Sequence, residues 1–217
     1  MSCHRFEVRL GLLLLLLTTA FWLWQNPGPL SRPIGSAEQA AYREALGKLP
    51  VPAADRDALI AATAGFMAAD DGQPVYMLNL MRYHPSLQRF DGAPEFAGTP
   101  EDSNRHYEDG TMPLLFGLGG YPLYAGRVSE PNLLEHAAEL DQWSRVLVVR
   151  YPNRRAFMNL ICDPAYAPLA PYKLMALQVV LTPGHGEILL PPMHWAVAAI
   201  ALLLFLAVGW WRAARRR

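Results

Sequence analysis

The chain has 217 residues, 52% of them hydrophobic, and its 19 basic and 19 acidic residues give a formal net charge of zero. Arginines gather at the two ends, so the part between them is net acidic. This excludes an electrostatic nucleic-acid binder, because phosphate contacts supply most non-specific affinity. The length fits one ordinary domain with additional segments, and two cysteines are too few for a disulfide framework.

The first segment, Leu10–Trp24, is an apolar run preceded by Arg5 and Arg9. The small residues Thr18–Ala20 resemble a signal-peptide cleavage site, but the apolar run continues past them, and its tryptophans are typical of a membrane–water interface. We therefore predict that residues 1–25 form an uncleaved transmembrane signal anchor, with a cleaved signal peptide as the alternative.

Residues 26–72 are expected to hold a linker and two helices. The segment Asn26–Gly35 is rich in proline and glycine, and Ser36 can then cap a helix that ends before Pro50. The segment Ala53–Ala69 has the apolar spacing of a second helix. These two helices precede the core, and they either pack against it or act as a stalk.

The core begins with a predicted strand, Val75–Arg82. Alternation places one row of side chains on the same face: Val75, Met77, Asn79 and Met81. Asn79 is the polar member of this otherwise apolar row. If the row is buried, the amide needs partners, which are either nearby backbone groups or a bound ligand.

A helix is predicted next, starting at Thr99 with Asp102 placed for a capping box and ending at Gly119. A second strand follows at Tyr121–Val128. Alternation places four of its side chains on one face: Tyr121, Leu123, Ala125 and Arg127. The segment from residue 130 to residue 142 is expected to be a loop or a short helix.

The second half of the core repeats this pattern. The β-branched run Val146–Val149 predicts a strand, and Asn153 caps the helix after it. Asp163 and Pro164 repeat the helix-start signal and predict a second short helix. The chain then returns as a strand at Leu177–Leu181.

The order strand, helix, strand, strand, helix, strand predicts an α+β fold with ferredoxin-like βαββαβ topology over residues 73–183. The two leading helices and a membrane segment at each end are additions to this core. Helices cover one face of such a sheet, so its other face needs a second cover.

After a predicted linker at residues 184–192, the segment Met193–Trp211 contains no Asp, Glu, Lys or Arg. At ~1.5 Å per residue it spans roughly 28 Å, close to the ~30 Å hydrocarbon core of a bilayer. Trp195 and Trp210 lie near its ends, and a basic tail follows at residues 212–217. We predict a transmembrane helix here.

Positive charge at both ends predicts that both termini lie in the cytoplasm. The core then lies on the periplasmic or extracellular side of a cell (inner) membrane that the chain crosses twice. Cys3 and Cys162 fall on opposite sides of this membrane and cannot pair within one chain.

Three stretches within about Gln73–Pro183 carry a resemblance to a known family: PVYMLNLMRYHP, GGYPLYAGRV and RYPNRRAFMNLICDPAYAPLAPYKLMAL. They are similar to the family called domain of unknown function thirteen-thirty. The resemblance implies ferredoxin-like domains that pair as homodimers into dimeric α+β barrels, related to cofactor-free antibiotic-biosynthesis-type monooxygenases. Related sequences often carry a His-Arg pair where this chain has Tyr172 and Lys173.

The sequence has none of the common catalytic signatures: G-x-S-x-G, the P-loop, H-E-x-x-H or C-x-x-C. Its histidines are scattered and form no pair at ligand spacing. We therefore expect no metal site and no bound cofactor.

Six side chains are candidates to converge on a pocket between the sheet and the helices: Asn79, His106, Tyr107, Tyr121, Arg127 and Trp143. His106 beside Tyr107 would suit a general base near neutral pH. The alternative is that His106 is a solvated residue on a polar helical turn.

Three functions are consistent with these features. The first is a membrane-anchored small-ligand-binding or assembly module on the extracytoplasmic side. The second is a cofactor-free monooxygenase-like enzyme that acts on a small hydrophobic or aromatic substrate. The third is a structural part that dimerises a membrane complex. We favour the first, with the membrane, a second copy and a small hydrophobic ligand as partners and no nucleic acid.

Overall fold

The computed structural model describes residues 2–130, 133, 142–188 and 193–215. The chain divides into two compact units, residues 1–185 and 186–217. Most of the predicted loop or helix at residues 130–142, the last part of the predicted linker at 184–192 and the end of the predicted basic tail lie outside the described residues.

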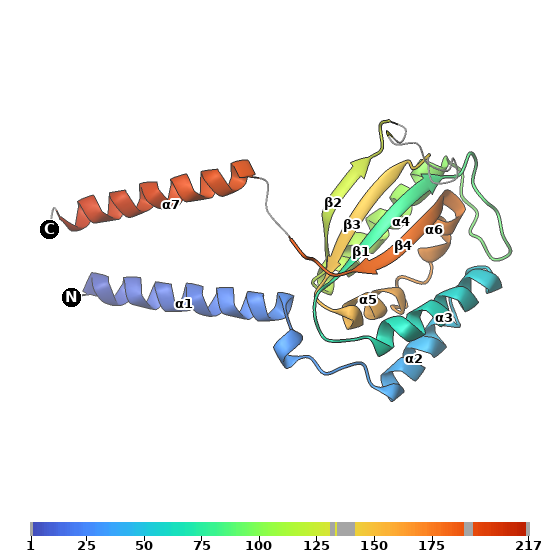
Figure 1. The fold of residues 1–217 in the computed structure, drawn as a ribbon, viewed down its shortest axis with the longest axis horizontal. Coiled ribbons are helices and arrows are strands. Elements are labelled where there is room, and N and C mark those ends of the chain that lie inside the picture. The colour runs from blue at the N-terminus through green and yellow to red at the C-terminus, as the bar shows by residue number, and fades with distance from the viewer. Residues whose placement is uncertain (1, 131–132, 134–141, 189–192, 216–217) are drawn as a thin grey trace. The chain divides into compact units, whose positions relative to one another are not determined.

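A four-stranded antiparallel sheet forms the centre of the first unit. Its strands lie in the spatial order β2-β3-β1-β4 (Figure 1). They are β1 (Val75–Tyr83), β2 (Tyr121–Arg127), β3 (Arg145–Tyr151) and β4 (Leu177–Gly184). The helices that alternate with them are α4 (Pro100–Gly117), α5 (Arg154–Ile161) and α6 (Ala170–Ala176). The order of elements along the chain and of strands in the sheet confirms the predicted α+β fold with ferredoxin-like topology.

The predicted face of β1 is confirmed. Val75, Met77, Asn79 and Met81 are all buried, and the residues between them are only partly buried. Their cross-strand partners on β3 include Tyr151, Val149 and Leu147, which are also buried. Directly opposed residues in a sheet share a face, so this helix-covered face holds the core.

The prediction that four side chains of β2 share one face is wrong for Tyr121. A bulge between Pro122 and Tyr124 inserts an extra residue into the ladder. As a result Tyr121 is opposite Arg150, on the open face, whereas Ala125 and Arg127 are on the helix-covered face. The prediction assumed an unbroken pleat, and a bulge shifts the alternation by one residue.

The predicted caps of two helices are confirmed. Thr99 and Asp102 form the capping box of α4. At the start of α5, Asn153 Oδ1 accepts a hydrogen bond from the Ala156 N–H at 2.8 Å.

The predicted helix start at Asp163 is wrong. Residues 164–169 form turns, and α6 begins only at Ala170. Asp163 Oδ1 instead accepts from the Ala165 N–H at 2.7 Å and closes a local turn. Pro168 has no N–H to donate to the Pro164 carbonyl, which disfavours a helix that runs from Asp163 through this position.

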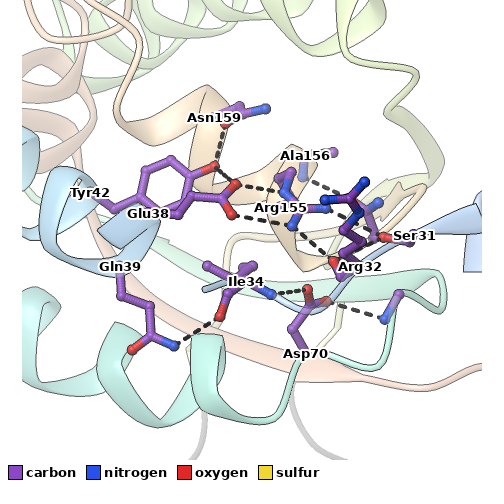
Figure 2. A network of polar contacts seen from close by, with 12 residues as sticks. Ser31, Arg32, Ile34, Glu38, Gln39, Tyr42, Asp70, Arg155, Ala156 and Asn159 are labelled. Atoms are coloured by element: carbon purple, nitrogen blue, oxygen red, sulfur yellow. Dashed lines mark hydrogen bonds and ion pairs between the residues drawn. The ribbon is translucent and has the colours of Figure 1, made fainter. Parts of the chain in front are cut away.

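The two leading helices, α2 (Ser36–Leu46) and α3 (Ala53–Ala68), pack against α5 rather than forming a stalk. Figure 2 shows the polar contacts at this junction. Arg155 on α5 donates from Nε to Glu38 Oε1 at 2.6 Å and from Nη2 to Glu38 Oε2 at 3.2 Å. Tyr42 donates its hydroxyl hydrogen to Asn159 Oδ1 at 2.6 Å. The bidentate Arg155–Glu38 pair fixes α2 on α5 with directional, charge-assisted bonds.

Helix α1 (Ser2–Gln25) ends in hydrogen bonds with the sheet, and the short helix η1 (Gly28–Leu30) follows it. The buried guanidinium of Arg150 donates to the Gln25 side-chain oxygen, the Gln25 backbone oxygen and Asn26 Oδ1, each at 2.8 Å. The Gln25 amide donates to the Gly119 carbonyl at 3.2 Å. The end of α1 is therefore part of a polar junction with the core.

Within the described residues, α1 and α7 (Met193–Ala214) are the helices long and apolar enough to cross a membrane. Their apolar windows are Val8–Gln25 and Ala196–Ala214, whose residues are almost entirely exposed. The first window also fits a signal sequence near the N-terminus. Helix α7 continues to Ala214, so the first part of the predicted tail is helical.

We predict that Glu38→Gln destabilises the full chain by about 1–2 kcal/mol at neutral pH, because it weakens charge-assisted bonds to a partly exposed carboxylate. The hydrogen bond from Arg155 lowers the pKa of Glu38 in the folded state. This stabilisation is therefore present above the unfolded carboxyl pKa of about 4.3 and is lost as the pH falls through the lower folded pKa.

Chemical denaturation between about pH 7 and pH 3 tests this prediction, and the difference between Glu38→Gln and the unmodified chain should shrink towards the acid end. Glu44→Gln is the matched control, because Glu44 is on the same helix and its ion pair among the described residues is with exposed Lys48. Equal stability of the unmodified chain and Glu38→Gln at neutral pH would show that the pair does not stabilise the junction.

Candidate functional site

A cavity of about 300 Å³ lies between the helix-covered face of the sheet and the helices. Most of its wall is apolar, and three methionines take part: Met77, Met81 and Met112. The segment between α2 and α3 and the start of α3 also contribute, through Leu49, Val51, Asp55 and Leu59. The leading helices therefore complete the cavity wall, which the order of the core elements could not have indicated.

The cavity wall also carries a group of polar side chains. They are Asn79, Asn104, Tyr107, Glu108, Thr111, Tyr166 and Lys173. Apolar walls with a few polar groups are typical of small-molecule sites. The contacts among these side chains decide what such a site can bind.

Asn79 links three elements of the core. Its Nδ2 donates to the backbone oxygens of Met77 at 3.2 Å and Leu147 at 3.3 Å. Its Oδ1 accepts a hydrogen bond from Lys173 Nζ at 3.2 Å. The amide is therefore satisfied by backbone groups of β1 and β3, and its oxygen holds the amine of α6 at the cavity wall.

Lys173 is one of two lysines in the chain, and its ammonium lies 5.3 Å from the centre of the Tyr107 ring. Burial lowers the pKa of Lys173 to about 8, and the negative charge of Glu108 opposes this shift. The ion pairs found among the described residues do not include Lys173. It is a partly buried amine with no carboxylate of the described residues at ion-pair distance.

Glu108 is already engaged by other groups. It forms an ion pair with Arg145 on β3, and it accepts a hydrogen bond from Asn104 Nδ2 at 3.1 Å. The side chains of Glu108 and Arg145 are both mostly buried. Because this carboxylate is neutralised by Arg145, it only partly compensates the charge of Lys173.

Two phenols complete the polar wall. The hydroxyls of Tyr107 and Tyr166 lie 3.4 Å apart, within hydrogen-bond distance. Burial raises the pKa of both Tyr107 and Tyr166 above the ordinary value for tyrosine. Both therefore stay neutral at physiological pH and cannot serve as an anionic partner for the lysine.

Of the six side chains nominated from the sequence, Asn79 and Tyr107 line this cavity. Arg127 and Trp143 line a second, more open groove, of about 730 Å³. Tyr121 lies on the open face of the sheet, where the Arg150 guanidinium lies 5.6 Å from its ring centre. The six side chains therefore do not converge on one pocket, contrary to the prediction from the sequence.

His106 lies outside the lining of both hollows. It is exposed on α4, with its ring centre 4.3 Å from that of Tyr172 and 6.0 Å from that of Phe96. The exposure fits the alternative of a residue on a polar helical turn.

Lys173 was not nominated from the sequence. A single lysine in a helix is usually a solvated residue. The two signals for it were its position within the otherwise apolar or aromatic segment Ala170–Ala176 and its place where related sequences often carry a His-Arg pair. Glu108 and Asn104 were also missed, because they lie in a strongly polar stretch of α4, and such a stretch predicts side chains exposed to solvent.

No family model and no curated protein matches the chain. Among solved structures, it is similar to a protein of unknown function from Rhodopseudomonas palustris, at 26% identity and a TM-score of 0.50 over 60% of this chain and 94% of that chain. The methylated form of that protein gives 26% identity and a TM-score of 0.51, over 61% and 92% of the two chains.

A third similar structure is SnoaB, a cofactor-independent oxygenase from Streptomyces nogalater, at 13% identity and a TM-score of 0.36, over 55% of this chain and 99% of that chain. The similar proteins thus include one of unknown function and one oxygenase, and the resemblance to the domain of unknown function thirteen-thirty family stays a prediction.

We predict that Glu108→Gln lowers the pKa of Lys173 further below about 8, because the negative charge that opposes the shift is removed. The measurement is a pH titration by NMR of the full chain in lipid nanodiscs, labelled with ¹³C at the lysine ε-carbons. With two lysines in the chain, Lys48→Met assigns the remaining lysine signal to Lys173. A Lys173 signal that titrates near the free-lysine value of about 10.4 would show that the amine is solvated.

Proposed function

We propose that this chain is a membrane-tethered domain that binds a small, mainly apolar molecule in the cavity between its sheet and its helices. The observation that carries the proposal is the cavity of about 300 Å³ with an apolar wall and a buried polar group around Asn79 and Lys173. Well-packed cores contain few voids much larger than a water molecule, so a hollow of this size favours a ligand.

The membrane part of the proposal rests on the two exposed apolar helices, α1 and α7. Arginines flank both, as at cytoplasmic ends of membrane helices: Arg5, Arg9, Arg212, Arg215, Arg216 and Arg217. This supports a topology with both termini in the cytoplasm and the core on the periplasmic or extracellular side. Domain boundaries close to residues 25, 72, 183 and 193 are part of the same proposal.

We also propose that a second copy of the chain covers the open face of the sheet. The residues on this face are largely apolar: Leu78, Leu80, Val146, Val148, Tyr124 and Val180. Tyr124 and Val180 are 59% and 43% exposed. A contiguous apolar sheet face of this kind is typical of an interaction surface, and the resemblance to dimeric α+β barrels supplies the partner.

An oxygenase that needs no cofactor is the second candidate. It would use the same cavity, and it is supported by the Lys173 amine, whose pKa of about 8 suits transfer of a proton from a bound substrate. The third function is a structural part that dimerises a membrane complex. In that case the cavity would bind no ligand, and the function would depend on the open face of the sheet alone.

Filling the cavity tests the proposed binding. Leu147→Trp replaces a leucine side chain by a larger indole ring at a buried position of the cavity wall. We expect it to abolish co-purification of a small molecule with the full chain, as measured by mass spectrometry of the protein released from native membranes. Leu30→Trp is the control, because Leu30 is 71% exposed and outside the cavity lining. If neither the unmodified chain nor Leu30→Trp carries a bound molecule, the ligand-binding function is wrong.

Introducing a charged side chain on the open face of the sheet tests whether this face forms the dimer interface. We expect Leu80→Lys to convert a dimer of the solubilised full chain into a monomer, because an unpaired cation would be desolvated in the interface. The same substitution at exposed Leu30 should leave the dimer intact. Sedimentation velocity distinguishes the two states, and a monomeric unmodified chain would contradict the proposal.

A further inference from the structure

The charge of the cavity wall is unbalanced. Lys173 brings a positive charge from α6, and Arg145 on β3 and Glu108 on α4 neutralise each other. Asp55 of α3 is on the wall as well, but it is exposed and forms no ion pair with Lys173 among the described residues. The polar end of the cavity therefore carries a positive charge that Glu108 compensates only in part.

The other titratable groups that face the amine do not supply the missing anion. Tyr107 and Tyr166 stay protonated because burial raises the pKa of each phenol, and burial raises the pKa of Tyr151 in the same way. Asn79 offers a neutral oxygen at 3.2 Å to one of the three ammonium hydrogens. Within the part of the chain that the structure describes, Asn79 is the one hydrogen-bond partner of the ammonium, which leaves two of its donors for a ligand.

Burial removes water from the Lys173 ammonium, and this desolvation is costly because Glu108 repays it only in part. A neutral apolar ligand would fill the cavity and increase this cost by excluding the remaining water. A ligand with one anionic oxygen group would instead pair with the ammonium in a low-dielectric site, where the attraction is strong. The apolar part of the same molecule would contact the methionine and leucine walls.

Resting on the proposed ligand-binding function, we propose that the ligand is a compact apolar carboxylate, whose anionic group pairs with the Lys173 ammonium. A cavity of about 300 Å³ holds on the order of ten to fifteen non-hydrogen atoms. Asn79 is a positioning residue in this site, because its oxygen holds the amine at the wall while its amide is tied to β1 and β3.

This arrangement makes binding depend on pH in a defined direction. The carboxylate binds the protonated amine, so affinity is highest below the pKa of Lys173 in the free protein, about 8. Between about pH 6.5 and pH 9.5 the protonated fraction falls roughly thirty-fold, and affinity should fall by about the same factor. A neutral ligand of the same shape should show no such fall.

The experiment uses two probes of equal size, naphthalene-2-carboxylate and naphthalene-2-carboxamide. They are titrated calorimetrically into the full chain in phosphatidylcholine nanodiscs, with empty nanodiscs as the blank for partition into lipid. We expect the carboxylate to bind at least tenfold more tightly than the amide at about pH 6.5. Lys173→Met should remove this preference, and Lys48→Met should keep it, because Lys48 is exposed and outside the cavity.

The outcomes separate the two levels of the proposal. Equal binding of both probes, unchanged by Lys173→Met and by pH, would be consistent with the ligand-binding function and would contradict the proposal that the ligand is a carboxylate. Binding of neither probe to the unmodified chain would overturn both. Because the pH series is measured on the unmodified chain, the test remains decisive even if Lys173→Met fails to fold.

Discussion

The Asn79 side chain connects the parts of the core that surround the cavity. It bonds to the backbone of β1 and β3, the two central strands, and accepts from the lysine of α6. An amide buried in a sheet face must satisfy its polar atoms, so this position fixes where α6 can place its amine. An apolar residue in its place would leave the ammonium without this oxygen.

The cavity also depends on contacts that lie outside the ferredoxin-like core. The Arg155–Glu38 pair holds α2 on α5, and the chain that follows α2 provides Leu49 and Val51 to the cavity wall. Opening of this junction would therefore remove part of the cavity wall. The leading helices are part of the binding domain in energetic terms, even though they precede its βαββαβ unit.

Local patterns in the sequence were sufficient to predict the fold and only part of the site. The alternation of β1 and the caps at Thr99 and Asn153 depend on near neighbours, and they were predicted correctly. The bulge in β2 depends on pairing with β3, and so Tyr121 was placed on the wrong face. Asn79 stood out as a polar residue in an apolar row. Lys173 did not, since its burial results from long-range packing that local spacing does not encode.

The three methionines of the cavity wall affect how selective the site can be. Met77, Met81 and Met112 have unbranched, flexible side chains that can change rotamer to fit different neighbours. A wall of this kind discriminates weakly between ligand shapes, in contrast to one built of β-branched residues. Chemically related molecules with different carbon skeletons should therefore compete for the same cavity, and recognition would depend chiefly on the head group.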